Sequence, residues 1–424
     1  MSEPVFDIAL DVLTKKYAAL KAEKLNLDLT RGKPSEVQLA LSNPMLENKN
    51  VFALDGSDCR NYGHLEGLPE ARKLFGEYLG VPTQNVFVLG NSSLAVMHDL
   101  VVQMLMRPVP GEVRRWDAYH NLRNQPVMLC PTPGYDRHHA ICEHYGIRML
   151  PVPMKDGALD IDLVESLVQT ERNVFGIWCV PKYSNPTGIT YSLEVCERLA
   201  NMEAPPGFRI FWDNAYAVHD LTEQSDELPN LFELCCRAKG SGRQEHREKE
   251  DRLFVIGSTS KITFASAGLA MLAASERNLA WFRQSLSVQT IGHDKLNQLW
   301  HVAFLKDMAG IRAHMAKHRA ILKPKFDRVD EVLKRELSEF NFVRWNRPKG
   351  GYFVNLFVPK GRAKRVVELA GLLGVKLTPA GAAFPYGKDP DDSHIRIAPT
   401  FPPLSEVQKA MEVVALCIII ATYE

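Results

Sequence analysis

Between residues 85 and 275 the sequence alternates short apolar runs with stretches of helical periodicity, and this alternation constrains the fold more than any other feature. The apolar runs are NVFVLG (85–90), PVMLC (126–130), IRMLPV (147–152), VFGIWCV (174–180), FRIFWD (208–213), RLFVIG (252–257) and GLAMLAAS (268–275). Runs that are apolar throughout and separated by helices predict a largely parallel sheet covered on both faces. Such sheets bind ligands beyond the carboxyl ends of their strands, so chemistry is expected there.

The charge and cysteine content exclude several classes of protein. The 424 residues carry 51 lysines and arginines against 50 acidic residues, which gives no reason to expect nucleic acid or an anionic membrane as a partner. The eight cysteines form no CxxC pair, which favours reduced core cysteines over disulfides or a zinc site. The N-terminus lacks the features of a signal peptide, and the run VVALCIII is too short to span a membrane. We therefore expect a cytoplasmic protein.

After residue 276 the pattern changes. The stretch IRAHMAKHRAILKPKFDRVDEVLKREL predicts a long helix, and GGYFVNLFV (350–358) and HIRIAP (394–399) predict strands around the helix RAKRVVELAGLLG. The final SEVQKAMEVVALCIII predicts a helix packed on the same unit, which makes a second, smaller domain. The charged segment 237–252 predicts a solvated surface loop.

Polar groups follow two neighbouring apolar runs. YSNPTG (183–188) is a turn by composition, and its Asn185 could donate to a ligand oxygen or belong to an ordinary turn. Asp213 ends FRIFWD, and Tyr216 follows three residues later. A carboxylate at that position is partly desolvated and needs a cationic partner, unless it is simply a helix N-cap.

Two further segments have the chemistry of an anion site. In GSTSKI (257–262), Lys261 follows three hydroxyl residues whose side chains and N–H groups suit a phosphate, although a surface lysine in a turn is the alternative. A lysine in such a pocket can have a lowered pKa and act as a Schiff-base nucleophile. In GNSSLAVMHD (90–99), Ser92 and Ser93 lie where a helix begins, which suits an anion and equally an ordinary N-cap.

Taken in order, these segments resemble the class I and II aminotransferases of fold type I. The order is a serine-bearing phosphate loop, PTPGY, NPTG, D-x-A-Y, S-x-S-K and IRIAPTFP, and the resemblance extends from YGHLEG (62–67) to Arg396. It implies the α/β fold of pyridoxal-phosphate-dependent transferases, with a large domain on a mainly parallel seven-stranded sheet and a smaller α+β domain. We place the large, cofactor-binding domain at residues 50–300 and the small domain at residues 1–49 together with 301–424.

The resemblance also implies roles around the cofactor ring. Lys261 resembles the lysine that holds pyridoxal 5′-phosphate as a Schiff base and moves the substrate proton. Asp213 resembles the partner of the pyridinium nitrogen, which keeps the ring an electron sink. Asn185 and Tyr216 resemble the pair that binds the phenolic oxygen, and Tyr135 resembles the aromatic residue that stacks on the ring.

Further roles concern the phosphate and the substrate. The implied phosphate ligands are Ser92, Ser93, Ser258 and Ser260. Tyr62 resembles the tyrosine that reaches the phosphate of a neighbouring subunit, which implies a homodimer. Arg396 resembles the bidentate clamp on the substrate α-carboxylate, with Asn185 also at the substrate. Gly32, in LTRGKP, resembles the glycine that approaches the same carboxylate.

The chain departs from the family at one position. Many relatives carry a phosphate-binding arginine a few residues after the lysine, whereas KITFASAGLAML is followed by no basic residue before Arg277. Two replacements are considered: Ser266 with further hydroxyl groups, and Lys295 from a partner subunit.

Several segments are more particular than the general family. LDLTRGKPS, RNYGHLEGLPEAR, CPTPGYDRHHAICEHYGI and VPKYSNPTGITYS resemble a bacterial subgroup of aspartate aminotransferases related to the aminotransferase half of MocR-type regulators. The implied activity is ping-pong transamination of L-aspartate and 2-oxoglutarate to oxaloacetate and L-glutamate. The enzyme alternative is an aromatic, kynurenine or 2-aminoadipate aminotransferase. The non-enzymatic alternative is a cofactor-binding regulator, for whose DNA-binding domain the segment before LTRGKPS leaves no room. Candidate cations for a distal substrate carboxylate are Arg31, Lys33, Arg123, Arg137 and Lys295.

Overall fold

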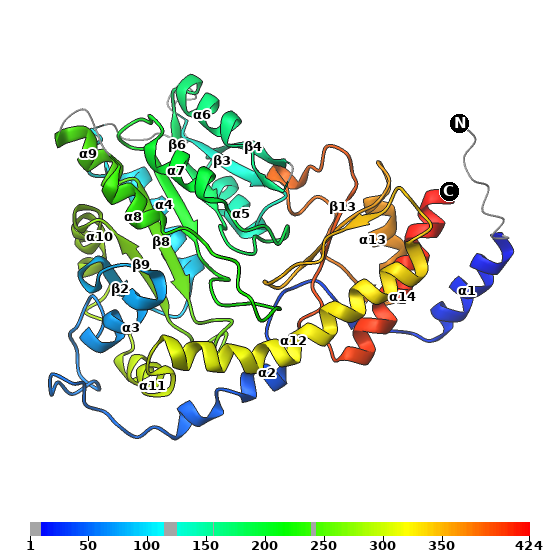
Figure 1. Ribbon diagram of the computed structural model, residues 1–424, viewed down its shortest axis with the longest axis horizontal. Helices are drawn as coiled ribbons and strands as arrows, with labels where there is room; N and C mark the ends of the chain where they lie inside the picture. Colours follow the sequence, from blue (N-terminus) through cyan, green and yellow to red (C-terminus); the bar gives the residue numbers. More distant parts are fainter. Residues whose placement is uncertain (1–9, 114–124, 156, 239–242) are drawn as a thin grey trace.

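The computed structural model of the protein describes residues 10–113, 125–155, 157–238 and 243–424. These residues form a larger lobe around a twisted sheet and a smaller lobe that lies near both chain ends (Figure 1).

The larger lobe is built on one sheet with the strand order β2-β9-β8-β7-β6-β3-β4-β5. Its strands are β2 (Val86–Val88), β3 (Val127–Thr132), β4 (Arg148–Lys155), β5 (Ala158–Leu159), β6 (Val174–Cys179), β7 (Arg209–Asp213), β8 (Leu253–Ser258) and β9 (Ala270–Ala274). The five neighbouring strands β8, β7, β6, β3 and β4 run parallel, while β9 is antiparallel to both β8 and β2. The seven apolar runs are therefore the seven expected strands, and the two-residue β5 adds an eighth at the edge.

Helices cover both faces of this sheet, as predicted. They are α3 (Pro69–Leu79), α4 (Ser93–Met106), α5 (Asp136–His144), α6 (Ile161–Thr170), α7 (Leu193–Asn201), α8 (Leu231–Arg237), α9 (Arg243–Glu250), α10 (Glu276–Gln289) and α11 (Lys295–Leu305). Successive side chains of a strand point to opposite faces, so Met128 of β3 belongs to the hydrophobic cluster on one face, with residues of α4, α5 and α10, and Leu129 to the cluster on the other face, with residues of α3, α6, α7 and α8. The strands are apolar throughout because both faces are buried.

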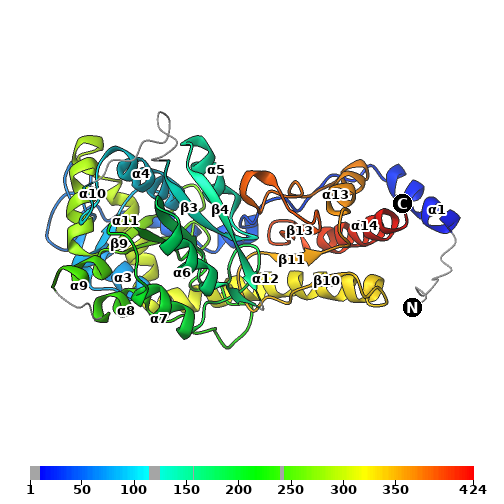
Figure 2. The ribbon, with the colours of Figure 1, turned by 90° about the horizontal axis from the view of Figure 1, so that it is seen from above.

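The smaller lobe combines the C-terminal part of the chain with the N-terminal segment. Its elements are α1 (Leu10–Ala22), β1 (Leu27–Asp28), α2 (Glu36–Ala40), β10 (Arg344–Trp345), β11 (Val354–Phe357), α13 (Ala363–Leu372), β12 (Val375–Lys376), β13 (His394–Ile397) and α14 (Leu404–Tyr423). Strands β10, β11 and β13 form an antiparallel sheet, and β1 pairs in parallel with β12. Helix α12 (Met308–Leu337) runs along both lobes (Figure 2).

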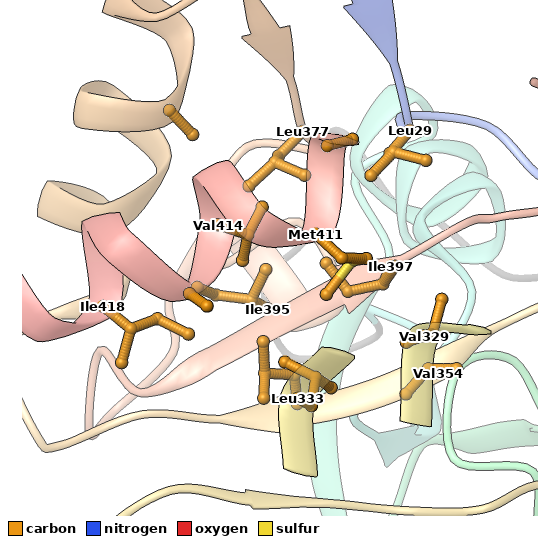
Figure 3. Close-up of a cluster of buried hydrophobic side chains, with 14 of the residues drawn as sticks. Leu29, Val329, Leu333, Val354, Leu377, Ile395, Ile397, Met411, Val414 and Ile418 are labelled. Carbon is orange, nitrogen blue, oxygen red and sulfur yellow. The ribbon is translucent and has the colours of Figure 1, made fainter. Parts of the chain in front are cut away.

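One hydrophobic cluster unites most of these elements. It contains Leu29 from the N-terminal segment together with Val329 and Leu333 of α12, Ile397 of β13 and Val414 of α14 (Figure 3). This shared core supports grouping the N-terminal segment with the C-terminal unit, while the division at residues 49/50 and 300/301 stays a prediction.

The prediction of a surface loop at residues 237–252 is wrong for the described residues of that segment. Arg243–Glu250 form α9, and Asp251 and Arg252 are buried. Asp251 pairs with Arg277 at 2.7 Å, and Arg252 donates to the carbonyl of Met202 at 2.6 Å. Charge alone predicts solvation, but Asp251 and Arg252 instead anchor the start of β8.

Among the described residues, no helix combines the length and the apolar character that crossing a membrane requires.

Candidate active site

The predicted site residues gather because their strands are parallel. Tyr135 follows β3, Asn185 follows β6, Asp213 ends β7 and Lys261 follows β8. Strand β2 runs in the same direction as β8, since both are antiparallel to β9, and it leads to Ser92. All five residues therefore lie at the carboxyl edge of one sheet, where α/β sheets bind ligands.

Lys261 lies close to the segment that follows β7. Its Nζ atom is 4.8 Å from the centre of the Tyr216 ring. Burial lowers the pKa of Lys261, and the negative charge of Asp213 opposes this shift in part. Burial also raises the pKa of Tyr216 well above its usual range. Burial therefore disfavours the charged forms of both side chains, the ammonium of Lys261 and the phenolate of Tyr216.

Asp213 is held by a histidine that sequence reasoning missed. The Nε2 atom of His138 lies 3.2 Å from Oδ2 of Asp213, and both side chains are buried. The His138 ring stacks on Trp178, with centroids 4.3 Å apart, and meets the ring of Tyr135 edge-on. The other carboxylate oxygen, Oδ1, is buried and has no partner among the described residues. A buried carboxylate oxygen in this state calls for a donor or a cation from a ligand.

Arg396 of β13 contacts the segments that follow β3 and β6. Its Nη1 atom donates to Asp136 at 2.9 Å and to Asn185 at 3.3 Å, and Nη2 donates to Thr378 at 3.4 Å. Its Nε atom is buried and has no partner in the described part of the chain. The guanidinium carbon lies 4.9 Å from the centre of the Phe353 ring.

Gly32 lies against that same ring. A Cβ atom at this position would come within 2.7 Å of Cζ of Phe353, which explains the glycine. Gly32 and Arg396 thus meet at Phe353, and Asn185 contacts Arg396, so the three predicted substrate residues are brought together.

The anion end of the site is made of turns and one helix start. Ser92 caps α4 by accepting from the N–H of Ala95, and Ser93 is the first residue of that helix. Asn91 donates to the carbonyl of Ser266 at 2.7 Å, which joins this helix start to the turn after Lys261. Ser258 is buried at the end of β8, and Ser260 follows it. Free N–H groups at a helix start beside hydroxyl groups suit a phosphate.

Tyr62 differs from the other predicted site residues because its side chain is exposed. Its side chain is 80% exposed, and its carbonyl accepts a hydrogen bond from Lys295 Nζ at 3.0 Å. Of the other candidate cations, Lys33 lies 3.8 Å from the centre of the Phe401 ring, while Arg31 and Arg137 are exposed. Arg123 lies outside the described residues.

Several contacts of the site were not foreseen. They involve Asp136, His138, Trp178, Phe353 and Thr378. His138 and Asp136 stand beside the predicted Tyr135 in PGYDRHH, so their position in a recognised motif was a usable signal.

Comparison with known proteins identifies the family. The family model described as aspartate amino-transferase matches residues 1–424. The chain belongs to this aminotransferase family. An aspartate aminotransferase of Corynebacterium glutamicum is 41% identical over 416 residues, which are 97% of this chain and 93% of that protein. The crystal structure of an aspartate transaminase from the same species has 40% identity and a TM-score of 0.90, and the match covers 97% of this chain and 95% of that one.

The fold is shared more widely. An α-aminoadipate aminotransferase of Thermus thermophilus, solved with N-(5′-phosphopyridoxyl)-L-leucine, has a TM-score of 0.74 at 23% identity and covers 96% of this chain and 97% of its own. The protein is a pyridoxal-phosphate-dependent aminotransferase of fold type I, acting on amino acids and 2-oxo acids.

The residues at the strand ends fit this cofactor. The unpartnered Oδ1 of Asp213 suits a protonated ring nitrogen, and the half-buried Lys261 amine, whose pKa is lowered, suits an aldehyde carbon. The hydroxyl-rich turn and the start of α4 suit the phosphate.

Proposed function

We propose that the enzyme transfers the amino group of L-aspartate to 2-oxoglutarate, giving oxaloacetate and L-glutamate in two ping-pong half-reactions. The observation that carries this proposal is the 41% identity, along 97% of the chain, to the Corynebacterium glutamicum protein named aspartate aminotransferase. Identity of this extent, without large gaps in coverage, favours a shared substrate class.

We assign Asp213 Oδ1 to the cofactor's ring nitrogen and the hydroxyl group of Tyr216 to its phenolic oxygen. Asn185 accepts from Arg396 through Oδ1, so its Nδ2 atom is left to donate to the same phenolic oxygen. Tyr135 is assigned to the face of the ring. When bound, pyridoxal phosphate supplies an electron sink that stabilises negative charge at the substrate Cα.

The phosphate is assigned to the turn after β8 and the start of α4. The hydroxyl groups concerned are those of Ser92, Ser93, Ser258 and Ser260. These groups and the backbone N–H groups of the helix start supply hydrogen bonds and a favourable dipole in place of a guanidinium.

Lys261 is assigned as the catalytic base. A lysine removes a proton only while its amine is uncharged, and the lowered pKa favours that form. With the cofactor bound, its Nζ atom would take the proton from the substrate Cα in the first half-reaction and would deliver it to the cofactor's aldehyde carbon. The second half-reaction runs these transfers in reverse.

Arg396 is assigned to the substrate α-carboxylate. Its unpartnered Nε atom and its fork geometry suit a carboxylate, and Gly32 leaves space beside it. Orientation of the amino acid by this clamp aligns its Cα hydrogen with Lys261.

We also propose a homodimer in which Tyr62 reaches the phosphate site of the partner. A tyrosine that is 80% exposed on a loop held by Lys295 is suited to a contact outside its own chain. Mixing inactive Lys261→Ala subunits with inactive Tyr62→Ala subunits tests this arrangement. Mixed dimers contain one site with both natural residues, so activity should return. No return of activity in proven mixed dimers would contradict shared sites.

A panel of amino donors tests the substrate. Aspartate, 2-aminoadipate, phenylalanine and kynurenine are compared, each with 2-oxoglutarate, and aspartate is expected to give the highest kcat/KM. A kcat/KM for aspartate about a hundredfold below that of phenylalanine or kynurenine would overturn the proposal.

A further inference from the structure

The backbone that carries Lys261 depends on side chains for its hydrogen bonds. The carbonyls of Lys261 and Ile262 lie in the turn between β8 and β9, and among the described residues no backbone N–H donates to either. Ile262 is fully buried. Buried carbonyls need hydrogen-bond donors, so the side chains that donate to these two carbonyls hold the turn in place.

Histidines supply those partners. His219 Nε2 lies 3.2 Å from the carbonyl oxygen of Lys261, and His314 Nε2 lies 2.7 Å from that of Ile262. The hydroxyl of Tyr352 is a weaker second donor to Lys261, at 3.5 Å. Because a carbonyl only accepts, both imidazoles must carry their proton on Nε2.

A glutamine sets the tautomer of a further histidine. Gln38 Oε1 accepts from the N–H of Ser35 at 3.0 Å, so its Nε2 is the donor at 3.1 Å to His318 Nδ1. His318 then carries its proton on Nε2, which lies 3.1 Å from His314 Nε2. Two N–H groups cannot hydrogen-bond to each other. The short distance between the two Nε2 atoms is explained if both N–H groups donate to the carbonyl oxygen of Ile262, which has two lone pairs.

A fourth histidine fixes the same turn from the other side. His301 donates through Nδ1 to the carbonyl of Asn297 at 2.8 Å, so its Nε2 accepts from the Thr263 hydroxyl, also at 2.8 Å. All four imidazoles are at most 5% exposed. Burial lowers the pKa of His219 to about 3 and those of His301 and His318 to about 4. The histidine contacts to the turn therefore favour uncharged imidazoles, which add no positive charge beside the Lys261 amine.

We propose that His219, His301, His314 and His318 form a histidine clamp that positions Lys261 for proton transfer. His219 belongs to the segment that carries Asp213 and Tyr216, so its bond fixes Lys261 relative to both. His314 and His318 lie on α12, beside α2 with Gln38 (Figure 1), so the clamp also ties the lysine to elements that reach the smaller lobe. The clamp residues touch neither substrate nor cofactor and act through the backbone of Lys261. This inference rests on the proposed role of Lys261.

Paired substitutions of the holoenzyme test the clamp. His219→Phe removes the donor, while His219→Gln keeps an N–H near the position of Nε2. The readouts are kcat and the pH midpoint at which the visible absorbance of the bound cofactor changes. His219→Phe should lower kcat about tenfold to hundredfold and move the midpoint by about half a pH unit or more, because a lysine displaced by an ångström loses its alignment and its electrostatic surroundings. His219→Gln should restore both.

Controls separate positioning from lost stability. Val329→Ala, in the core of the smaller lobe, should lower the melting temperature without moving the absorbance midpoint. Tyr352→Phe removes the weaker donor and nearly preserves the shape of the side chain. It should move the absorbance midpoint in the same direction as His219→Phe, but by less. The clamp can therefore be tested even if His219→Phe does not fold. An unchanged midpoint in both His219→Phe and Tyr352→Phe, or a Gln variant that behaves like Phe, would overturn the clamp. Loss of the visible absorbance in Lys261→Ala tests the role of Lys261 separately.

Discussion

The Nε2 atom of His138 lies 3.2 Å from Oδ2 of Asp213, in a buried pair that leaves the other carboxylate oxygen without a partner. One oxygen is thus bound by the protein and the other is presented to a ligand. The His138 imidazole is itself stacked on the Trp178 ring, which restrains the group that binds the carboxylate. This arrangement gives Asp213 a fixed direction in addition to its charge.

Removing the charge of Asp213 should slow the reaction far more than it weakens cofactor binding. Asp213→Asn keeps the volume and the contact to His138 but cannot stabilise a protonated ring nitrogen. We expect kcat to fall about a hundredfold to a thousandfold, as for other preorganised electrostatic groups. Steady-state kinetics and equilibrium cofactor titration measure the two effects. Asp251→Asn removes another buried carboxylate, away from the site, and should affect only stability. A kcat equal in Asp213→Asn and the natural enzyme would contradict the assignment.

His138 should matter through Asp213. His138→Phe keeps the stacking on Trp178 but removes a hydrogen bond to a buried carboxylate, which is worth about 1.5–3 kcal/mol, or roughly tenfold to hundredfold in kcat/KM. His139 is the matched control, because it is the adjacent buried histidine and its Nδ1 atom has no partner among the described residues. His139→Phe should leave kcat/KM close to natural. Equal losses of kcat/KM in the two variants would show that the contact between His138 and Asp213 is not the cause of the loss.

The strands and their ends could be predicted because they depend on local sequence. An uninterrupted apolar run such as VFGIWCV must be buried on both faces, so β6 and its neighbours follow from composition and spacing alone. Parallel strands then bring Asn185, Asp213 and Lys261 to one edge, although they are far apart in the chain.

The contacts between the lobes could not be predicted in this way. Arg396 pairs with Asp136, 260 positions away in the chain, and this contact exists only because the smaller lobe packs against α5. The histidines around Lys261 come from three separate elements, and each one alone is an unremarkable residue on a helix or loop. Side-chain partners of this kind depend on how packed units meet, which no local pattern encodes.

Arg396→Lys should damage substrate binding while preserving the positive charge. Lysine is a point charge and cannot bind Asp136, Asn185 and a carboxylate with one planar group. We expect kcat/KM for amino acids to fall about tenfold to hundredfold, mostly through KM, in line with the loss of a charge-assisted hydrogen bond. Kinetics with both the amino acid and the 2-oxo acid measure this, since the two share the α-carboxylate. An effect on only one of the two substrates would argue against a common clamp.

Gly32→Ala should act on Arg396 through Phe353. The added methyl would lie 2.7 Å from Cζ of Phe353, so the ring must move, and the Arg396 guanidinium packs on that ring. Overpacking of this kind costs about 1–3 kcal/mol. We expect a higher KM and a lower melting temperature. Gly371→Ala is the control, since a Cβ there meets nothing within 4 Å. A normal KM in Gly32→Ala would place the glycine outside the substrate site.

The buried neutral histidines should make the fold sensitive to acid. Burial lowers the pKa of His219 to about 3 and those of His301 and His318 to about 4, from an ordinary 6.5. Below pH 6.5 the unfolded chain therefore binds protons that the folded chain does not. The free energy of unfolding should fall as pH drops from 6.5 towards 4, each histidine adding a slope of at most about 1.4 kcal/mol per pH unit, and the loss should level off below the folded pKa values. Urea unfolding at several pH values measures the slope. His301→Gln removes one titrating group and should flatten it, whereas equal stability at pH 5 and pH 7.5 would contradict neutral burial.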